Sequence, residues 1–136
     1  MTDADHLLTL VNLGLADAVA DSESLLAFED GWDGAGSPGY AEPTWQRAIL
    51  LLVEIASTLR DSHQLRLSAA EIMPGSYGNI DIETHTTNRM LMFSVPADQA
   101  SPVRYYGHDE GRRNTTKGVL DLQSNPQWLS GWLAGE

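Results

Sequence analysis

The 136-residue sequence contains no cysteine. Without thiols the chain forms no disulfide and offers no thiolate nucleophile or thiolate metal ligand. It also lacks an apolar run of the roughly 20 residues that a membrane span needs, because the longest candidate, residues 48–56, contains Glu54. We therefore expect no membrane association, and the absence of cysteine fits a cytoplasmic location.

Basic residues are missing from the N-terminal third. The first 46 residues carry no Lys or Arg, and Arg47 is the first base. A secretory signal needs positive charge before its apolar segment, so we interpret residues 7–20 as an amphipathic helix. The net charge is −11, of which −9 belongs to this third and −2 to the rest. The acidic residues of this third are Asp3, Asp5, Asp17, Asp21, Glu23, Glu29, Asp30, Asp33 and Glu42. Such a region repels phosphate and attracts a basic partner, so nucleic acid is not an expected ligand.

Helical periodicity predicts two helices before residue 62. The first, capped by Asp3 or Asp5, has apolar residues at spacings of three and four and is expected to break near residues 21–22. Its predicted buried face is Leu7, Leu8, Val11, Leu15, Ala18 and Val19. Residues 29–43 are rich in turn-forming residues. The second helix is led by Pro43 and is expected to reach about Asp61. Its apolar face is Trp45, Ile49, Leu52, Ala56 and Leu59.

After the second helix the apolar period changes to two, which is typical of strands. Strands are predicted over 70–73, 78–85, 90–95, 103–107 and 115–120, with a loop over 107–111. A short C-terminal helix is predicted to open at Asn125 and Pro126 and to carry Trp128 and Trp132 on its apolar face. Helices followed by a meander predict one α+β domain over residues 1–136, with the two N-terminal helices packed on an antiparallel sheet of four to five strands.

A tetrapeptide in the predicted loop, Gly31-Trp32-Asp33-Gly34, is followed by the proline-led helix and then by 78–83 and 89–91. This order resembles a group of small uncharacterised bacterial proteins with a Gly-Trp-Asp-Gly loop, a helix and a β-meander. Members commonly carry a tryptophan at the end of the first hairpin strand, where this chain has Thr84 and His85. The resemblance implies a fold often encoded near mobile or defence-related genes, which favours a binding protein. It carries no activity over to any residue.

The glycine-rich segment 34–39 matches the dinucleotide pattern G-x-G-x-x-G by letter only. No strand is predicted before it, Pro38 interrupts the place of the helix, and nearby aspartates repel phosphate. We interpret it as a loop. Arg104, Tyr105 and Tyr106 lie in a basic-aromatic cluster that is interrupted by acids, which disfavours binding of single-stranded nucleic acid.

Asp81, Glu83 and His85 alternate along one predicted strand, so all three point to the same face. Their spacing permits either metal coordination or acid–base chemistry, and the same pattern is typical of a solvated strand face. No other pattern indicates catalysis, and no cofactor is expected.

Three functions from different classes remain open. The first is a protein-binding module of the inhibitor, antitoxin or immunity type, which holds a basic protein through Asp30, Trp32, Asp33 and Tyr40 with the two aromatic rings exposed. The alternative is a small metal-binding protein or enzyme that uses the Asp81, Glu83 and His85 face. A self-associating protein that uses the C-terminal helix is the third. The charge segregation favours the first.

Overall fold

A computed structural model describes residues 3–32, 34–36, 38–111, 114–120 and 127–135, and of residues 3–7 and 127 it describes the backbone alone. The helical elements are α1 (Asp3–Leu13), α2 (Ala16–Ser22), the 3-10 helix η1 (Glu23–Ala27), α3 (Glu42–His63), the 3-10 helix η2 (Ser76–Gly78) and α4 (Gln127–Leu133). The strands are β1 (Ala69–Pro74), β2 (Ile80–His85), β3 (Arg89–Val95), β4 (Val103–Asp109) and β5 (Asn114–Leu120).

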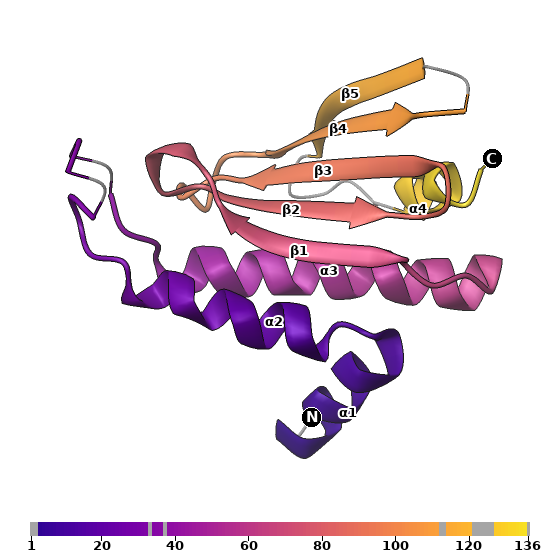
Figure 1. The fold of residues 1–136 in the computed structure, drawn as a ribbon, viewed down its shortest axis with the longest axis horizontal. Coiled ribbons are helices and arrows are strands. Elements are labelled where there is room, and N and C mark those ends of the chain that lie inside the picture. The colour runs from indigo at the N-terminus through magenta and orange to yellow at the C-terminus, as the bar shows by residue number, and fades with distance from the viewer. Residues whose placement is uncertain (1–2, 33, 37, 112–113, 121–126, 136) are drawn as a thin grey trace.

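The five strands form one antiparallel sheet in the order β1-β2-β3-β4-β5, so each strand pairs with its neighbours in sequence (Figure 1). The predicted α+β class, the meander of four to five strands and the short C-terminal helix are confirmed. Because the order is sequential, β1 and β5 are the two edges of the sheet.

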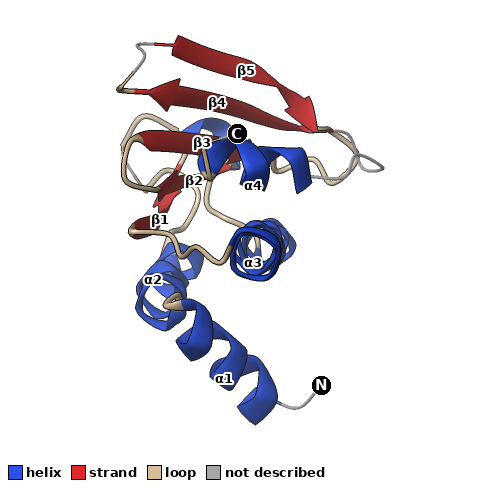
Figure 2. Cartoon of the chain, turned by 90° about the vertical axis from the view of Figure 1, so that its right-hand side faces the viewer, coloured by secondary structure: helices blue, strands red, loops and turns tan. Residues whose placement is uncertain are grey.

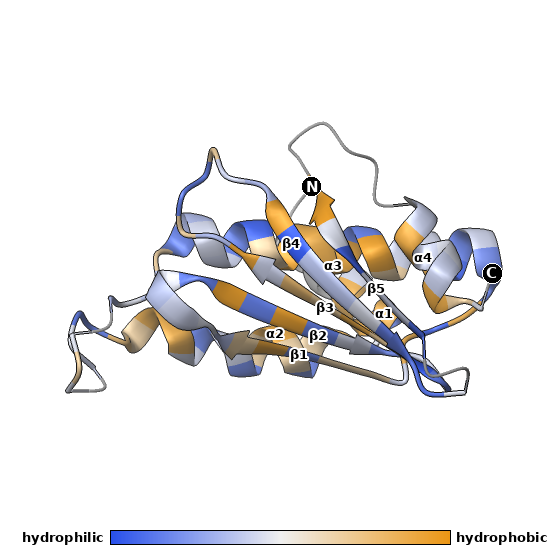
Figure 3. Cartoon of the chain, turned by 90° about the horizontal axis from the view of Figure 1, so that it is seen from above, coloured by the Kyte–Doolittle hydropathy of each residue, from blue (hydrophilic) through white to orange (hydrophobic). Residues whose placement is uncertain are grey.

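One face of the sheet holds the core. In β2 the residues Ile80, Ile82 and Thr84 are buried and alternate with partly exposed ones, and the same alternation is visible in the colouring along β2 in Figure 3. The helices α3 and α4 lie on the buried face (Figure 2). The hydroxyl of Ser130 donates a hydrogen bond to the Ile55 carbonyl at 3.1 Å, which ties α4 to α3.

Helix α3 matches its prediction closely. It begins at Glu42, has Pro43 in its first turn, and buries Ile49, Leu52, Ala56 and Leu59, while Trp45 is partly buried. The helix ends two residues later than predicted, at His63, because Gln64 adopts the left-handed conformation (φ 53°) that closes a helix.

The first predicted helix is two helices, because Gly14 ends α1. Gly14 has φ 75°, its N–H donates to Val11, and the N–H of Leu15 donates to Leu10. These two bonds are the pair that terminates a helix at a left-handed glycine. The predicted break at residues 21–22 is instead a change from α2 to η1.

The predicted buried face of α1 was also wrong. Leu8 and Val11 are more than half exposed, whereas Leu10 and Leu13 are buried. Helix α1 contacts α3 and α2 and lies away from the sheet, so of the N-terminal helices α2 and α3 are the ones that contact strands (Figure 1).

Strand β4 is longer than predicted and includes His108 and Asp109, which were expected in a loop. They pair with Thr115 and Asn114 of β5, so neither belongs to a loop. The proposed helix start at Asn125 and Pro126 lies outside the described residues.

Candidate functional site

The loop that was predicted to bind a partner is anchored by an aromatic cluster. The ring of Phe28 lies 4.9 Å from that of Trp32 and 5.7 Å from that of Tyr40. The Tyr40 hydroxyl donates to the Gly75 carbonyl at 2.9 Å, and the Trp32 indole N–H donates to Pro38 at 3.1 Å. These contacts fix the loop against the turn that follows β1.

The four predicted partner-binding residues differ in exposure. Tyr40 is only 6% exposed, which corrects the expectation that its ring is free to contact a partner. Trp32 is 43% exposed and remains accessible. Asp30 is exposed, and one of its carboxylate oxygens accepts the N–H of Gly39 at 2.9 Å, so it also closes the loop. Asp33 lies outside the described residues.

Asp81, Glu83 and His85 lie on the outer face of β2, as predicted, and are partly exposed. His85 Nε2 lies 3.5 Å from Glu83 Oε1. No group of three or more His, Asp or Glu side chains within the described ranges is arranged to hold a metal ion. We therefore derive no metal chemistry from this face.

His108 of β4 lies on the same outer face of the sheet but is not a neighbour of His85. Register places His108 opposite Met90 of β3, and Met90 lies opposite His85, so a whole strand separates the two histidines. Asp109 is buried and forms an ion pair with Arg89, with Nε to Oδ2 at 3.0 Å. Its carboxylate is therefore a structural group.

The acidic N-terminal third presents uncompensated charge. The described carboxylates at its surface that form no ion pair are Asp17, Asp21, Glu23, Glu29, Asp30 and Glu42. The nearest base in sequence, Arg47, donates to the Ser101 carbonyl at 2.8 Å, and Arg66 donates to the Asn12 carbonyl. Arg60 forms its ion pair with the adjacent Asp61 at 2.8 Å. Arg66 therefore places one positive charge beside α1, but none of these three arginines forms an ion pair with a carboxylate named above.

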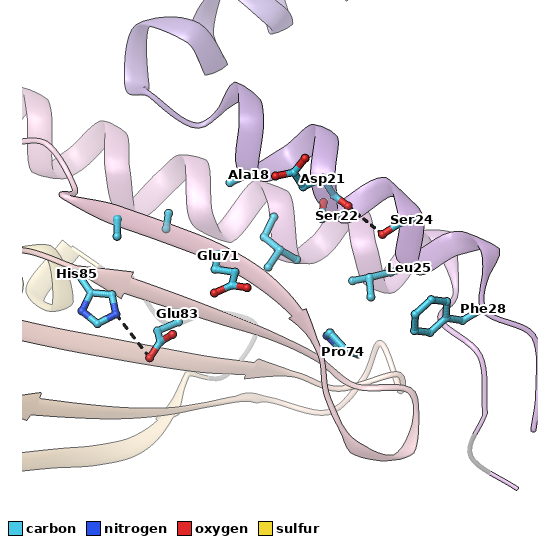
Figure 4. Close-up of a pocket in the computed structure, with 13 residues that line it drawn as sticks. Ala18, Asp21, Ser22, Ser24, Leu25, Phe28, Glu71, Pro74, Glu83 and His85 are labelled. Carbon is cyan, nitrogen blue, oxygen red and sulfur yellow. Dashed lines mark hydrogen bonds and ion pairs between the residues drawn. The ribbon is translucent and has the colours of Figure 1, made fainter. Parts of the chain in front are cut away.

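A groove of about 460 Å³ lies between the α2–η1 segment and β1. Figure 4 shows Asp21 and Ser24 on the helical side of this groove and Glu71, Glu83 and His85 on the strand side. Small and apolar side chains also line it, among them Ala18, Leu25, Phe28, Ala69, Ala70 and Ile72. The groove thus combines apolar side chains with three carboxylates.

Sequence reasoning missed this groove because its walls come from segments about fifty residues apart. Asp21 and Glu71 are unremarkable within their own elements, and only the packing of α2 against β1 brings them to one groove. The local signal that was available is the pair of alanines at the start of β1, which leaves room beside the strand.

Comparison of the chain with protein-family models, with curated proteins and with solved structures finds no match. The resemblance based on the Gly-Trp-Asp-Gly loop therefore stays a prediction. No helix in the described part of the chain is long and apolar enough to cross a membrane.

Proposed function

We propose that this chain is a protein-binding module that holds a basic partner protein through its acidic N-terminal third. The observation that carries the proposal is the set of exposed, unpaired carboxylates on α2, η1 and the loop that follows. Like charges gathered on one surface create a field that speeds the approach of an oppositely charged protein and selects against acidic ones.

The loop between η1 and α3, which carries Trp32, supplies an apolar surface for such an interface. Trp32 is partly exposed and rests against Phe28, so it presents a rigid aromatic surface beside Asp30. Tryptophan is enriched among the residues that contribute most to protein interfaces, because it buries a large area with little loss of conformational freedom. An inhibitor, antitoxin or immunity-type role in the cytoplasm is consistent with a small module of this kind.

The test is affinity capture from host extract with a tagged chain and two charge-matched variants. The test variant combines Asp17→Asn, Glu23→Gln and Glu29→Gln, all in the acidic third. The control combines Glu54→Gln, Asp61→Asn and Glu110→Gln, which are exposed acids outside it. Both variants have the same net charge, and they differ in where the charge is lost and in the Arg60–Asp61 ion pair, which only the control removes.

We expect the parent chain and the control to retain a basic protein at stoichiometric yield, and the test variant to lose most of it. Mass spectrometry of the captured material identifies the partner and gives its yield. Equal capture by all three chains, or capture of no basic protein by the parent, would show that the acidic third is not the binding surface.

A further inference from the structure

The edge of β1 that lines the groove is not paired with another strand of the described residues. The N–H of Gly75 donates to the Asn79 carbonyl at 2.9 Å, which marks these two residues as a hydrogen-bonded pair in the ladder. Because hydrogen-bonded and non-bonded pairs alternate, Met73, Glu71 and Ala69 direct their backbone groups toward β2. The backbone N–H and C=O groups of Ala70 and Ile72 therefore point to the groove side.

Consecutive residues from Ala69 to Ile72 all line the groove. Side chains of a strand alternate between the two faces, so a run of neighbours lines a groove only when the strand presents its edge to it. The groove is therefore bordered by the edge of β1, where Ala70 is partly exposed and Ile72 is 7% exposed. An extended chain is the ligand whose backbone can pair with such an edge.

The charges on the groove select its occupant. Three carboxylates line it, those of Asp21, Glu71 and Glu83, and none of its lining residues in the described part of the chain is a lysine or an arginine. A second copy of this chain pairing through the same edge would bring its own Glu71 near this one, which is unfavourable. A lysine or arginine side chain instead places its aliphatic part over Ala18 and Ala70 and its charge among the carboxylates.

We propose that the groove between α2–η1 and β1 binds an extended, basic segment of the partner, which adds to the edge of β1 and inserts a lysine or arginine side chain between Asp21 and Glu71 (Figure 4). This proposal rests on the proposed function, and it specifies where on this chain the basic partner binds. It predicts that the partner presents alternating basic residues in an exposed strand or an unstructured tail.

The probe is a peptide of six residues, the length of β1, that alternates Lys and Val, with an equally long Glu and Val peptide as its counterpart. It is titrated into the isotope-labelled full chain, and amide chemical shifts and amide hydrogen exchange are followed by NMR. We expect the basic peptide to shift the amides of residues 69–72 and of α2, and to slow exchange at the partly exposed Ala70. The acidic peptide should bind at least about tenfold more weakly, because carboxylates repel it.

Two alanines of α2 provide a matched pair of variants. Ala18 lines the groove, whereas Ala20 is exposed on the same helix and does not line it. Leucine is nearly as good a helix former as alanine, so Ala18→Leu and Ala20→Leu should both keep α2 intact. Filling the groove with Ala18→Leu should weaken peptide binding about tenfold, and Ala20→Leu should leave it within about twofold.

The groove proposal is overturned if the two alanine variants bind the peptide equally, if the shifts lie outside the groove, or if the peptide does not bind. The capture experiment judges the proposed function separately. A basic partner that is lost from the triple acid variant and retained by Ala18→Leu would leave the function standing and the groove excluded.

Discussion

Two arginine–aspartate pairs in this chain have opposite environments. Arg89 and Asp109 join β3 to β4 with side chains 10% and 7% exposed, and Arg89 also donates to the Trp132 carbonyl and lies over its ring. Arg60 and Asp61 are neighbours on the surface of α3. The hydrogen bond and charge of Arg60 lower the pKa of Asp61, although both side chains are in water.

We predict that Asp109→Asn lowers the free energy of unfolding by about 2 to 3 kcal/mol, because it leaves the buried guanidinium without its counter-charge. Urea denaturation followed by tryptophan fluorescence measures the difference. Asp61→Asn is the control and should leave the denaturation midpoint unchanged, since water replaces an exposed partner. If the two variants lost equal stability, Arg89–Asp109 would not be a structural pair.

At the residue scale the sequence shows which side chains are charged or apolar, but it does not predict which residues they contact in the fold. Asp109 was expected in a loop because it is flanked by Gly107 and Gly111, and its partner Arg89 is twenty residues away. Tyr40 was expected at the surface because its loop is polar, yet its ring packs on Phe28 and its hydroxyl reaches Gly75. Both errors arise from contacts distant in sequence.

At the element scale the strongly periodic segments were predicted well. Helix α3 and strands β2 and β3 each have an unbroken apolar pattern, and their bounds were found within about two residues. The N-terminal helices were predicted less well, because apolar residues occur on more than one side of each helix and several faces fit. The cap at Gly14 then decides where α1 ends, and the contact with α3 decides which leucines are buried.

Gly107 shows how one element constrains another. It lies on the inner face of β4, where a Cβ would stand 2.8 Å from the Trp132 ring of α4 and 2.9 Å from the Thr116 methyl of β5. The absence of a side chain at Gly107 therefore leaves space for the ring of Trp132, which packs α4 against the sheet.

We predict that Gly107→Ala lowers the free energy of unfolding by about 1 to 3 kcal/mol, because the added methyl displaces α4 from β4. Thermal unfolding measures the loss of stability, and the near-ultraviolet circular dichroism of the four tryptophans reports the changed packing of α4. Gly111→Ala is the matched control, since a Cβ there meets its nearest neighbour at 3.4 Å. An unchanged signal in Gly107→Ala would mean that α4 is seated by other contacts.

At the scale of the whole molecule, the sequence predicted the charge segregation and not the groove. The segregation is a property of composition along the chain, so it is visible without a fold. The groove depends on the position of α2 beside the edge of β1, which no periodicity encodes. The candidate site therefore comes from the structure, and of its three carboxylates only Asp21 belongs to the acidic third.

The acidic third also lowers the stability of the fold, because its like charges repel one another. Varying the salt concentration separates this effect on stability from the effect of the same charges on binding. Asp17 and Asp21 stand four residues apart on α2, so they repel each other in the folded state. Between about 0.01 M and about 0.1 M salt the screening length falls from about 30 Å to about 10 Å. The free energy of unfolding should therefore rise over this range. The rise should be smaller in the Asp17→Asn, Glu23→Gln, Glu29→Gln variant, and urea titrations at each salt concentration measure it.

Binding of the Lys and Val peptide to the same chain should weaken over that range, mainly through a slower association rate, because screening removes the attraction that guides encounter. Stability and affinity are thus expected to respond to salt with opposite signs, and both responses should shrink in the triple variant. If salt strengthened both, apolar burial would govern binding, and the acidic third would serve solubility alone.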